Sequence, residues 1–129
     1  MMASPGVRIF AAIPAAPMLG NGVGFLLSPE QAAASLGMPL LDGLGRSTQI
    51  GDFGAFFLGI TIFVLVGAYR STSHWLYAGA IMLGLAAVIR TWAWVMHGAD
   101  LATVFIGVEV VLAGWLVTAG LLMDRARQD

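Results

Sequence analysis

Four long apolar windows constrain this chain most, because each is long enough to cross a lipid bilayer as a helix. They run from about residue 7 to 27, 48 to 68, 74 to 97 and 100 to 123. A helix needs about 20 mostly apolar residues to cross a hydrocarbon core of about 30 Å. The windows lack the apolar–polar alternation of a transmembrane strand, and backbone polar groups in lipid must be bonded internally. The sequence therefore predicts an all-α, four-helix transmembrane bundle, with residues 1–129 as a single domain.

Composition supports the membrane assignment and excludes several functional classes. Hydrophobic residues make up 59% of the chain and charged residues 10%, whereas charged residues usually make up about 25% of a soluble domain. The net charge is −1, with six Arg and no Lys, so the basic surface of a nucleic-acid-binding protein is missing. Without cysteine, disulfides, thiol catalysis and iron–sulfur clusters are excluded.

The first window has a second interpretation as a secretory signal peptide, because Arg8 precedes a short apolar run. Two features favour a transmembrane helix instead. The apolar run continues to Leu27, and Pro14 and Pro17 interrupt the segment that would be the core of a signal peptide. We expect a helix kinked near Pro17.

The arginines predict the orientation of the spans. With the N-terminus inside, the inner side carries Arg8, Arg70, Arg125 and Arg127, while the outer side carries Arg46 alone. Positive charge accumulates on the cytoplasmic side of membrane proteins, so we expect both termini inside. Arginine without lysine, together with many alanines and glycines, is typical of a GC-rich bacterial genome. The predicted location is therefore the bacterial inner (plasma) membrane.

The long connection between the first two spans contains the signals of a short helix. Ser28 precedes Pro29 and Glu30, the order of a cap, a first-turn proline and a first-turn acid. Gly37, followed by Pro39, ends the segment. We expect a helix from residue 29 to 36 at the outer interface, with a lid over the space between the spans as its alternative role.

Small residues recur at helical spacing in each span and predict close helix packing. These stripes are Ala12, Ala16, Gly20 and Gly24 in the first span, Gly51, Ala55 and Gly59 in the second, Gly79, Leu83, Ala86 and Arg90 in the third, and Glu109, Ala113, Leu116 and Gly120 in the fourth. Some of them have the alternative role of facing a second copy or another subunit.

The stretch between the last two spans predicts an ion pair inside the membrane. Gly98 can end a helix and Asp100 can cap the next, so the two spans form an antiparallel hairpin centred near residue 99. Arg90 precedes that centre by about nine residues and Glu109 follows it by about ten, which places both roughly 14 Å from the turn. Because both also lie on stripes of small residues, we expect Arg90 and Glu109 to pair.

Further polar residues fall in the same, outer half of the predicted bundle. Arg46 is expected at the outer interface, Asp52 about one and a half turns deeper, and Asn21 near the outer part of the first span. His97 follows Trp94 by one turn and shares a face with Arg90. We expect one of Trp92 and Trp94 to meet lipid and the other the core.

A charge at the bilayer centre costs at least about 2.5–3.5 kcal/mol, so this cluster needs an explanation. One is a structural network of Arg90, Glu109 and Asp52 that fixes the helix register. A second is a site that handles a ligand or a proton, and a third is a contact with a partner subunit.

Histidine spacing argues against haem and metal sites. His74 and His97 lie at opposite ends of the third span, whereas a bis-histidine haem site needs both at one depth. The residues that could supply a metal site are Asp52, His97, Asp100 and Glu109, and we expect no metal. No cofactor is predicted.

Several of these motifs resemble those of a known family. An Arg precedes a Gly-rich second span (GRSTQIGDFGAFFLG), another lies late in the third (VIRTWAW), a Gly marks the turn (HGAD) and a Glu lies in the fourth (VEVVLAG). This combination resembles a domain-of-unknown-function family of small bacterial four-helix membrane proteins. The resemblance covers nearly the whole chain and implies the four-helix fold, without an activity. His97 and Asp52–Phe53 depart from the family pattern.

Three functional hypotheses follow. The first is binding of a membrane lipid or small amphipathic molecule, with Arg90 and Arg46 facing its polar head, because the arginine fork suits anionic groups. The second is a small intramembrane isomerase or lyase that uses Glu109 or Asp52 as a general base, with Arg90 or His97 as the electrostatic or acid partner. The third is an accessory subunit of a larger membrane complex, or a homo-oligomer.

Overall fold

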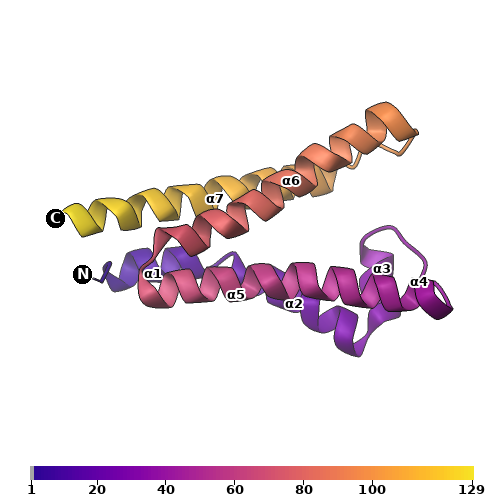
Figure 1. Ribbon diagram of the computed structural model, residues 1–129, viewed down its shortest axis with the longest axis horizontal. Helices are drawn as coiled ribbons and strands as arrows, with labels where there is room; N and C mark the ends of the chain where they lie inside the picture. The colour runs from indigo at the N-terminus through magenta and orange to yellow at the C-terminus, as the bar shows by residue number, and fades with distance from the viewer. Residues whose placement is uncertain (1) are drawn as a thin grey trace. The chain divides into compact units, whose positions relative to one another are not determined.

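The computed structural model describes residues 2–129, and within them the protein is helical, without strands. In chain order (Figure 1) the elements are α1 (Pro5–Ala12), α2 (Ala15–Leu27), α3 (Pro29–Ser35), α4 (Gly43–Thr48), the π-helix η1 (Gln49–Phe53), α5 (Gly54–Arg70), α6 (Ser73–His97) and α7 (Thr103–Gln128). Four helical stretches are long and apolar enough to cross a membrane, namely Pro5–Leu27, Gly43–Arg70, Ser73–His97 and Thr103–Gln128. The all-α class and the four apolar spans are confirmed, and the chain is a multi-pass membrane protein.

The chain divides into two compact units. The first comprises Met1–Pro14 and Phe63–Asp129, and the second comprises Ala15–Ile62. The first unit thus contains α1, the end of α5, and the hairpin of α6 and α7. The second contains α2, α3, α4, η1 and the beginning of α5. The assembly of the four spans into one bundle stays a prediction.

The hairpin of the first unit packs along the face that its sequence predicts. Gly79 and Leu83 of α6 are buried, as are Glu109, Leu116 and Gly120 of α7. Close approach is most evident at Gly120, where an added Cβ would lie 2.8 Å from Cζ of the Tyr77 ring. The small-residue stripes of the third and fourth spans therefore mark the contact between these two helices.

Four residues of the stripes predicted for the first two spans do not pack against other parts of this chain, and the alternative that such stripes face a second copy stays a prediction. Ala16, Gly20, Gly51 and Ala55 are exposed, and nothing lies within 4 Å of a Cβ added at Gly20 or Gly51. The buried faces instead combine small residues with large apolar ones. They are Ala11, Ala15, Met18, Gly22 and Phe25 along α1 and α2, and Phe57, Ile60, Thr61 and Val64 along α5.

Aromatic stacking explains the buried face of the second unit. The Phe25 ring stacks on Phe53 with centroids 5.4 Å apart and on Phe57 at 6.1 Å. Gly22 lets Leu58 approach α2, since an added Cβ would lie 2.6 Å from Leu58 Cδ2. Large apolar contacts therefore decide which side of α2 is buried.

A break in the first span occurs at residues 13–14, not at Pro17 as expected. Pro14 has no backbone N–H, so the carbonyl of Phe10, four residues earlier, loses its helical donor. The Trp115 indole Nε1–H donates to that carbonyl at 2.8 Å, and the Phe10 and Trp115 rings stack at 5.1 Å. Pro17 is tolerated because it is the third residue of α2, within the first turn, where backbone N–H groups have no helical acceptor.

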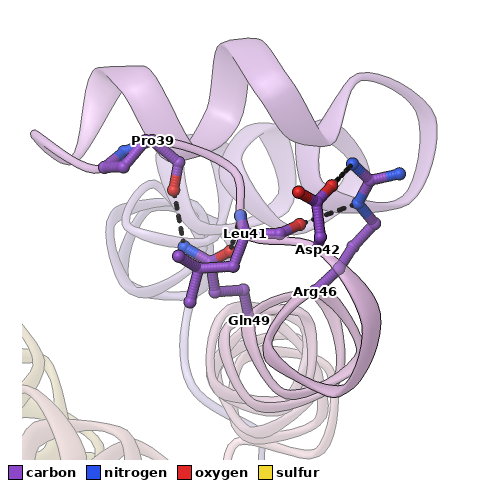
Figure 2. A network of polar contacts seen from close by, with 5 residues as sticks. All are labelled: Pro39, Leu41, Asp42, Arg46 and Gln49. Atoms are coloured by element: carbon purple, nitrogen blue, oxygen red, sulfur yellow. Dashed lines mark hydrogen bonds and ion pairs between the residues drawn. The ribbon is translucent and has the colours of Figure 1, made fainter.

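The predicted helix in the long connection is present as α3, with Ser28 at its N-cap and Pro29 at its first position. Its place at a membrane interface stays a prediction. Gln49, buried at the start of η1, holds the loop between α3 and α4 against that helix (Figure 2). Its Oε1 accepts from Leu41 N at 2.7 Å, and its Nε2 donates to Pro39 O at 3.0 Å.

Candidate functional site

The centre of the candidate site is an ion pair between α6 and α7. Arg90 Nε donates to Glu109 Oε1 at 2.8 Å. Arg90 lies seven residues before the end of α6 at His97, and Glu109 lies six residues after the start of α7 at Thr103. Both residues are therefore about 10 Å from the helix ends. The predicted pairing and equal depth are confirmed.

The geometry of this pair leaves polar atoms without partners. Arg90 binds Glu109 through Nε rather than through the two-pronged fork that arginine often uses with carboxylates. Within residues 2–129, Glu109 Oε2 is buried and has no hydrogen-bond partner. The Glu109 side chain is 10% exposed and the Arg90 side chain 32%. The pair thus presents a buried acceptor beside a partly accessible guanidinium.

Phe105 completes the surroundings of the guanidinium. Its ring centroid lies 4.9 Å from Arg90 Cζ, a cation–π distance. Because Phe105 precedes Glu109 by one helical turn, the two side chains hold Arg90 from the same face of α7. Sequence reasoning missed Phe105, although its four-residue spacing from Glu109 was the signal that could have found it.

Two predicted site residues lie on the exposed surface of α6, beyond Arg90. Trp94 is 47% exposed, and His97 is the exposed last residue of the helix. Trp92 is 57% exposed, so the expectation that one of the two tryptophans meets the core is wrong. Both tryptophans therefore present apolar surface on the outside of α6.

The turn of the hairpin confirms one predicted residue and corrects another. Gly98 ends α6 in the left-handed conformation with φ of 68°, a conformation that favours glycine. Asp100 was expected to cap the next helix, but α7 begins at Thr103 and its N-cap position is Ala102. Asp100 is exposed within the connecting residues 98–102.

The other predicted site residues belong to the second unit. Arg46 donates to Asp42 Oδ1 at 3.0 Å and to Leu41 O at 2.9 Å (Figure 2). Asn21 Nδ2 donates to Pro17 O of its own helix at 3.0 Å. Asp52 is exposed within η1, a helix type frequent at functional sites. The expected network of Asp52 with Arg90 and Glu109 stays a prediction.

The sequence offers Asp52, His97, Asp100 and Glu109 as possible metal ligands. Among residues 2–129, no group of three or more His, Asp or Glu side chains is arranged to hold a metal ion.

Comparison with known proteins returned no similarity. No protein-family model, no curated protein and no solved structure matches this chain.

The Arg90–Glu109 pair can serve two kinds of chemistry. The guanidinium can donate hydrogen bonds to a phosphate, carboxylate or carbonyl group, and Glu109 Oε2 can accept one from a hydroxyl or amine. Alternatively, a carboxylate held by a single hydrogen bond can accept a proton from a bound molecule. Both uses depend on the same unpartnered oxygen.

Proposed function

We propose that this membrane protein binds a lipid-like or small amphipathic molecule, whose polar head contacts Arg90 and Glu109. The observation that carries the proposal is the buried Glu109 Oε2 without a hydrogen-bond partner. A buried polar atom left unbonded costs about 1–3 kcal/mol. A ligand that donates a hydrogen bond to this oxygen would recover that cost.

The chemistry of the pair restricts the head group. The Arg90 guanidinium can donate to an acceptor such as a phosphate, carboxylate or carbonyl oxygen. Glu109 Oε2 can accept from a donor such as a hydroxyl or amine. A head with both groups, on an apolar tail, matches the site best. The tail would lie against exposed apolar residues of α6 and α7 such as Ile89, Trp94 and Val110.

Native mass spectrometry of the full chain in a mild detergent tests this proposal. A bound molecule of constant mass is expected with the natural protein and should be lost with Glu109→Gln and Arg90→Ala. Asp124→Asn is the matched control, because it removes the acid that accepts from Tyr77 Oη at 2.8 Å between the same two helices. The control should keep the bound molecule.

Other outcomes would overturn the proposal. A bare protein, unchanged by either substitution, would assign the pair a structural role. A co-purifying protein in place of a small molecule would support the accessory-subunit hypothesis. Equal loss in the Asp124→Asn control would show that detection follows folding and not the site.

The same oxygen favours a second candidate, a small intramembrane isomerase or lyase with Glu109 as general base. Once the bound molecule is known, incubation with the natural protein would return it chemically changed under this hypothesis. Glu109→Gln would abolish the change. Recovery of the unaltered molecule after prolonged incubation would exclude catalysis on that compound.

The orientation, with both termini inside the bacterial plasma membrane, is part of the proposal. Because the chain lacks cysteine, single introduced cysteines give unambiguous labelling. In intact cells, a membrane-impermeant maleimide should label Asp100→Cys, in the hairpin turn, and leave Arg127→Cys unlabelled. The reverse pattern would place the N-terminus outside.

A further inference from the structure

A groove in the first unit lies between α1 and the end of α5. It has a volume of about 320 Å³, and its lining includes Arg8, Ile9, Ala12, Leu65 and Tyr69. It lies far from the Arg90–Glu109 pair, near the other end of α6. Ala3 N, just before α1, donates to Ser71 Oγ, just before α6, at 3.0 Å, so the start of α1 lies beside the start of α6. Arg90 lies 17 residues along α6 from Ser73, about 26 Å away. The groove is therefore distinct from the site proposed above.

Arg8 is held in a fixed position at the polar end of the groove. Its Nε donates to Ala68 O at 3.0 Å and its Nη2 donates to Tyr69 O at 2.9 Å. These carbonyls are in the last turn of α5, where backbone C=O groups have no N–H donor within the helix. The guanidinium carbon also lies 5.9 Å from the Tyr69 ring centroid. Nη1 makes no hydrogen bond within the described chain and stays available as a donor.

The groove changes from polar to apolar along the direction of the spans. Arg8 is the fourth residue of the span Pro5–Leu27, and Tyr69 is the second-to-last of Gly43–Arg70. Both are thus at one membrane surface. Ala12 and Leu65 lie one turn deeper than Arg8 and Tyr69, about 6 Å towards the membrane centre. A phospholipid in the adjacent leaflet has the same order, with its phosphate outermost and its acyl chains inward.

Charge complementarity selects the type of lipid. Arg8 is the one charged residue among the lining residues, and no acid lines the groove. A zwitterionic head would bring an ammonium group that finds no carboxylate there. An anionic head without an ammonium group brings only the charge of its phosphate. That charge suits the guanidinium of Arg8, and Tyr69 is a residue type enriched at membrane interfaces.

We propose that this groove binds one anionic phospholipid, with its phosphate at Arg8 and Tyr69 and an acyl chain along Ile9, Ala12 and Leu65. The bound lipid would attach the first span to the end of the second at that surface. This inference does not depend on the function proposed for Arg90 and Glu109.

The test is native mass spectrometry of the full chain in detergent, titrated with dioleoylphosphatidylglycerol or dioleoylphosphatidylcholine. One arginine near a membrane surface is worth about a five-fold preference for an anionic lipid. We expect at least that preference for the phosphatidylglycerol in the natural protein. It should vanish in Arg8→Gln, where the amide retains a hydrogen-bond donor for the α5 carbonyls.

Two further variants separate the groove from general charge and from folding. Arg70→Gln removes the neighbouring cation, which does not line the groove, and should keep the preference. Ala12→Leu fills the apolar part without touching Arg8 and should weaken binding of both lipids.

Three results would overturn the inference. These are equal binding of both lipids by the natural protein, equal loss of preference in Arg70→Gln and Arg8→Gln, and unchanged binding in Ala12→Leu. Displacement of the lipid by glycerol 3-phosphate alone would also contradict it, because that result would assign the site to a free phosphate ester.

Discussion

Arg90 reaches Glu109 through Nε alone, at 2.8 Å, and leaves Oε2 of that carboxylate buried and unbonded. The pair is electrically neutral as a unit, which lowers the cost of placing both charges inside a membrane span. It is also incomplete as a hydrogen-bonded unit. The unbonded acceptor is the feature on which the proposed ligand binding rests.

Removing one partner of this pair should destabilise the protein more than removing both. Arg90→Leu leaves the Glu109 carboxylate buried without compensation, so we expect a loss of about 3 kcal/mol in the free energy of unfolding. Glu109→Leu should cost less, because the Arg90 side chain is 32% exposed. The double variant should come within about 1 kcal/mol of the natural protein.

Denaturant unfolding in detergent micelles, followed by far-UV circular dichroism, measures this double-mutant cycle. Strictly additive losses would show that the two side chains do not interact energetically.

The Trp115 indole should matter only because Pro14 is present. Trp115→Phe keeps a ring against Phe10 but removes the N–H that bonds the freed carbonyl. We expect a loss of about 1–2 kcal/mol in stability. In a Pro14→Ala background the backbone N–H of residue 14 is restored, so the same substitution should cost much less. An equal cost in both backgrounds, by thermal unfolding, would reject this coupling.

Gly120 should be intolerant of the smallest side chain. A Cβ there would meet the Tyr77 ring, with Cζ at 2.8 Å and Cδ1 at 3.0 Å, and overpacking of this kind costs about 1–3 kcal/mol. Gly120→Ala should therefore lower the thermal midpoint. Gly114→Ala, on the same helix with nothing within 4 Å of the added atom, should be neutral or slightly stabilising. Equal midpoints for the two variants would contradict this packing.

Gln49 should control the opening of the loop before the second span. Gln49→Leu leaves Leu41 N–H and Pro39 C=O without the side chain that bonds both. Each such bond is worth about 0.5–1.5 kcal/mol, so the Leu41 amide should exchange with deuterium about ten times faster. Exposed Gln31 of α3 provides the control as Gln31→Leu, which should leave this exchange rate unchanged. Unaltered exchange in Gln49→Leu would show that the loop is held by other contacts.

Local sequence determines the spans and the main pair. The four spans were predictable because a membrane-spanning helix depends on the total hydropathy of about 20 consecutive residues. Their predicted ends differ from those in the structure by up to five residues. The Arg90–Glu109 pairing was predictable because a short connection fixes the register of two antiparallel helices. The helix in the long connection was predictable from Ser28 and Pro29, which act on their own neighbours.

Other features were not predictable from the residues around them. Small-residue spacing did not indicate the buried faces of the first two spans, where Phe25 stacks on Phe53 and Phe57. Pro14 and Pro17 both offered a place for the break, and the sequence did not show that Trp115, about 100 residues further along the chain, bonds the carbonyl freed by Pro14. No pattern near Asp100 indicated that α7 starts only at Thr103.

The sequence by itself determined that this chain is helical, crosses a membrane with four apolar segments, and carries an arginine and a glutamate at one depth of a hairpin. These properties follow from local hydrophobicity and from the rise of a helix per residue. Only the tertiary structure decided that Arg90 binds by Nε, that Phe105 supports it and that Oε2 is unbonded. Such details depend on side-chain rotamers and on packing between helices, which become fixed only when distant segments meet.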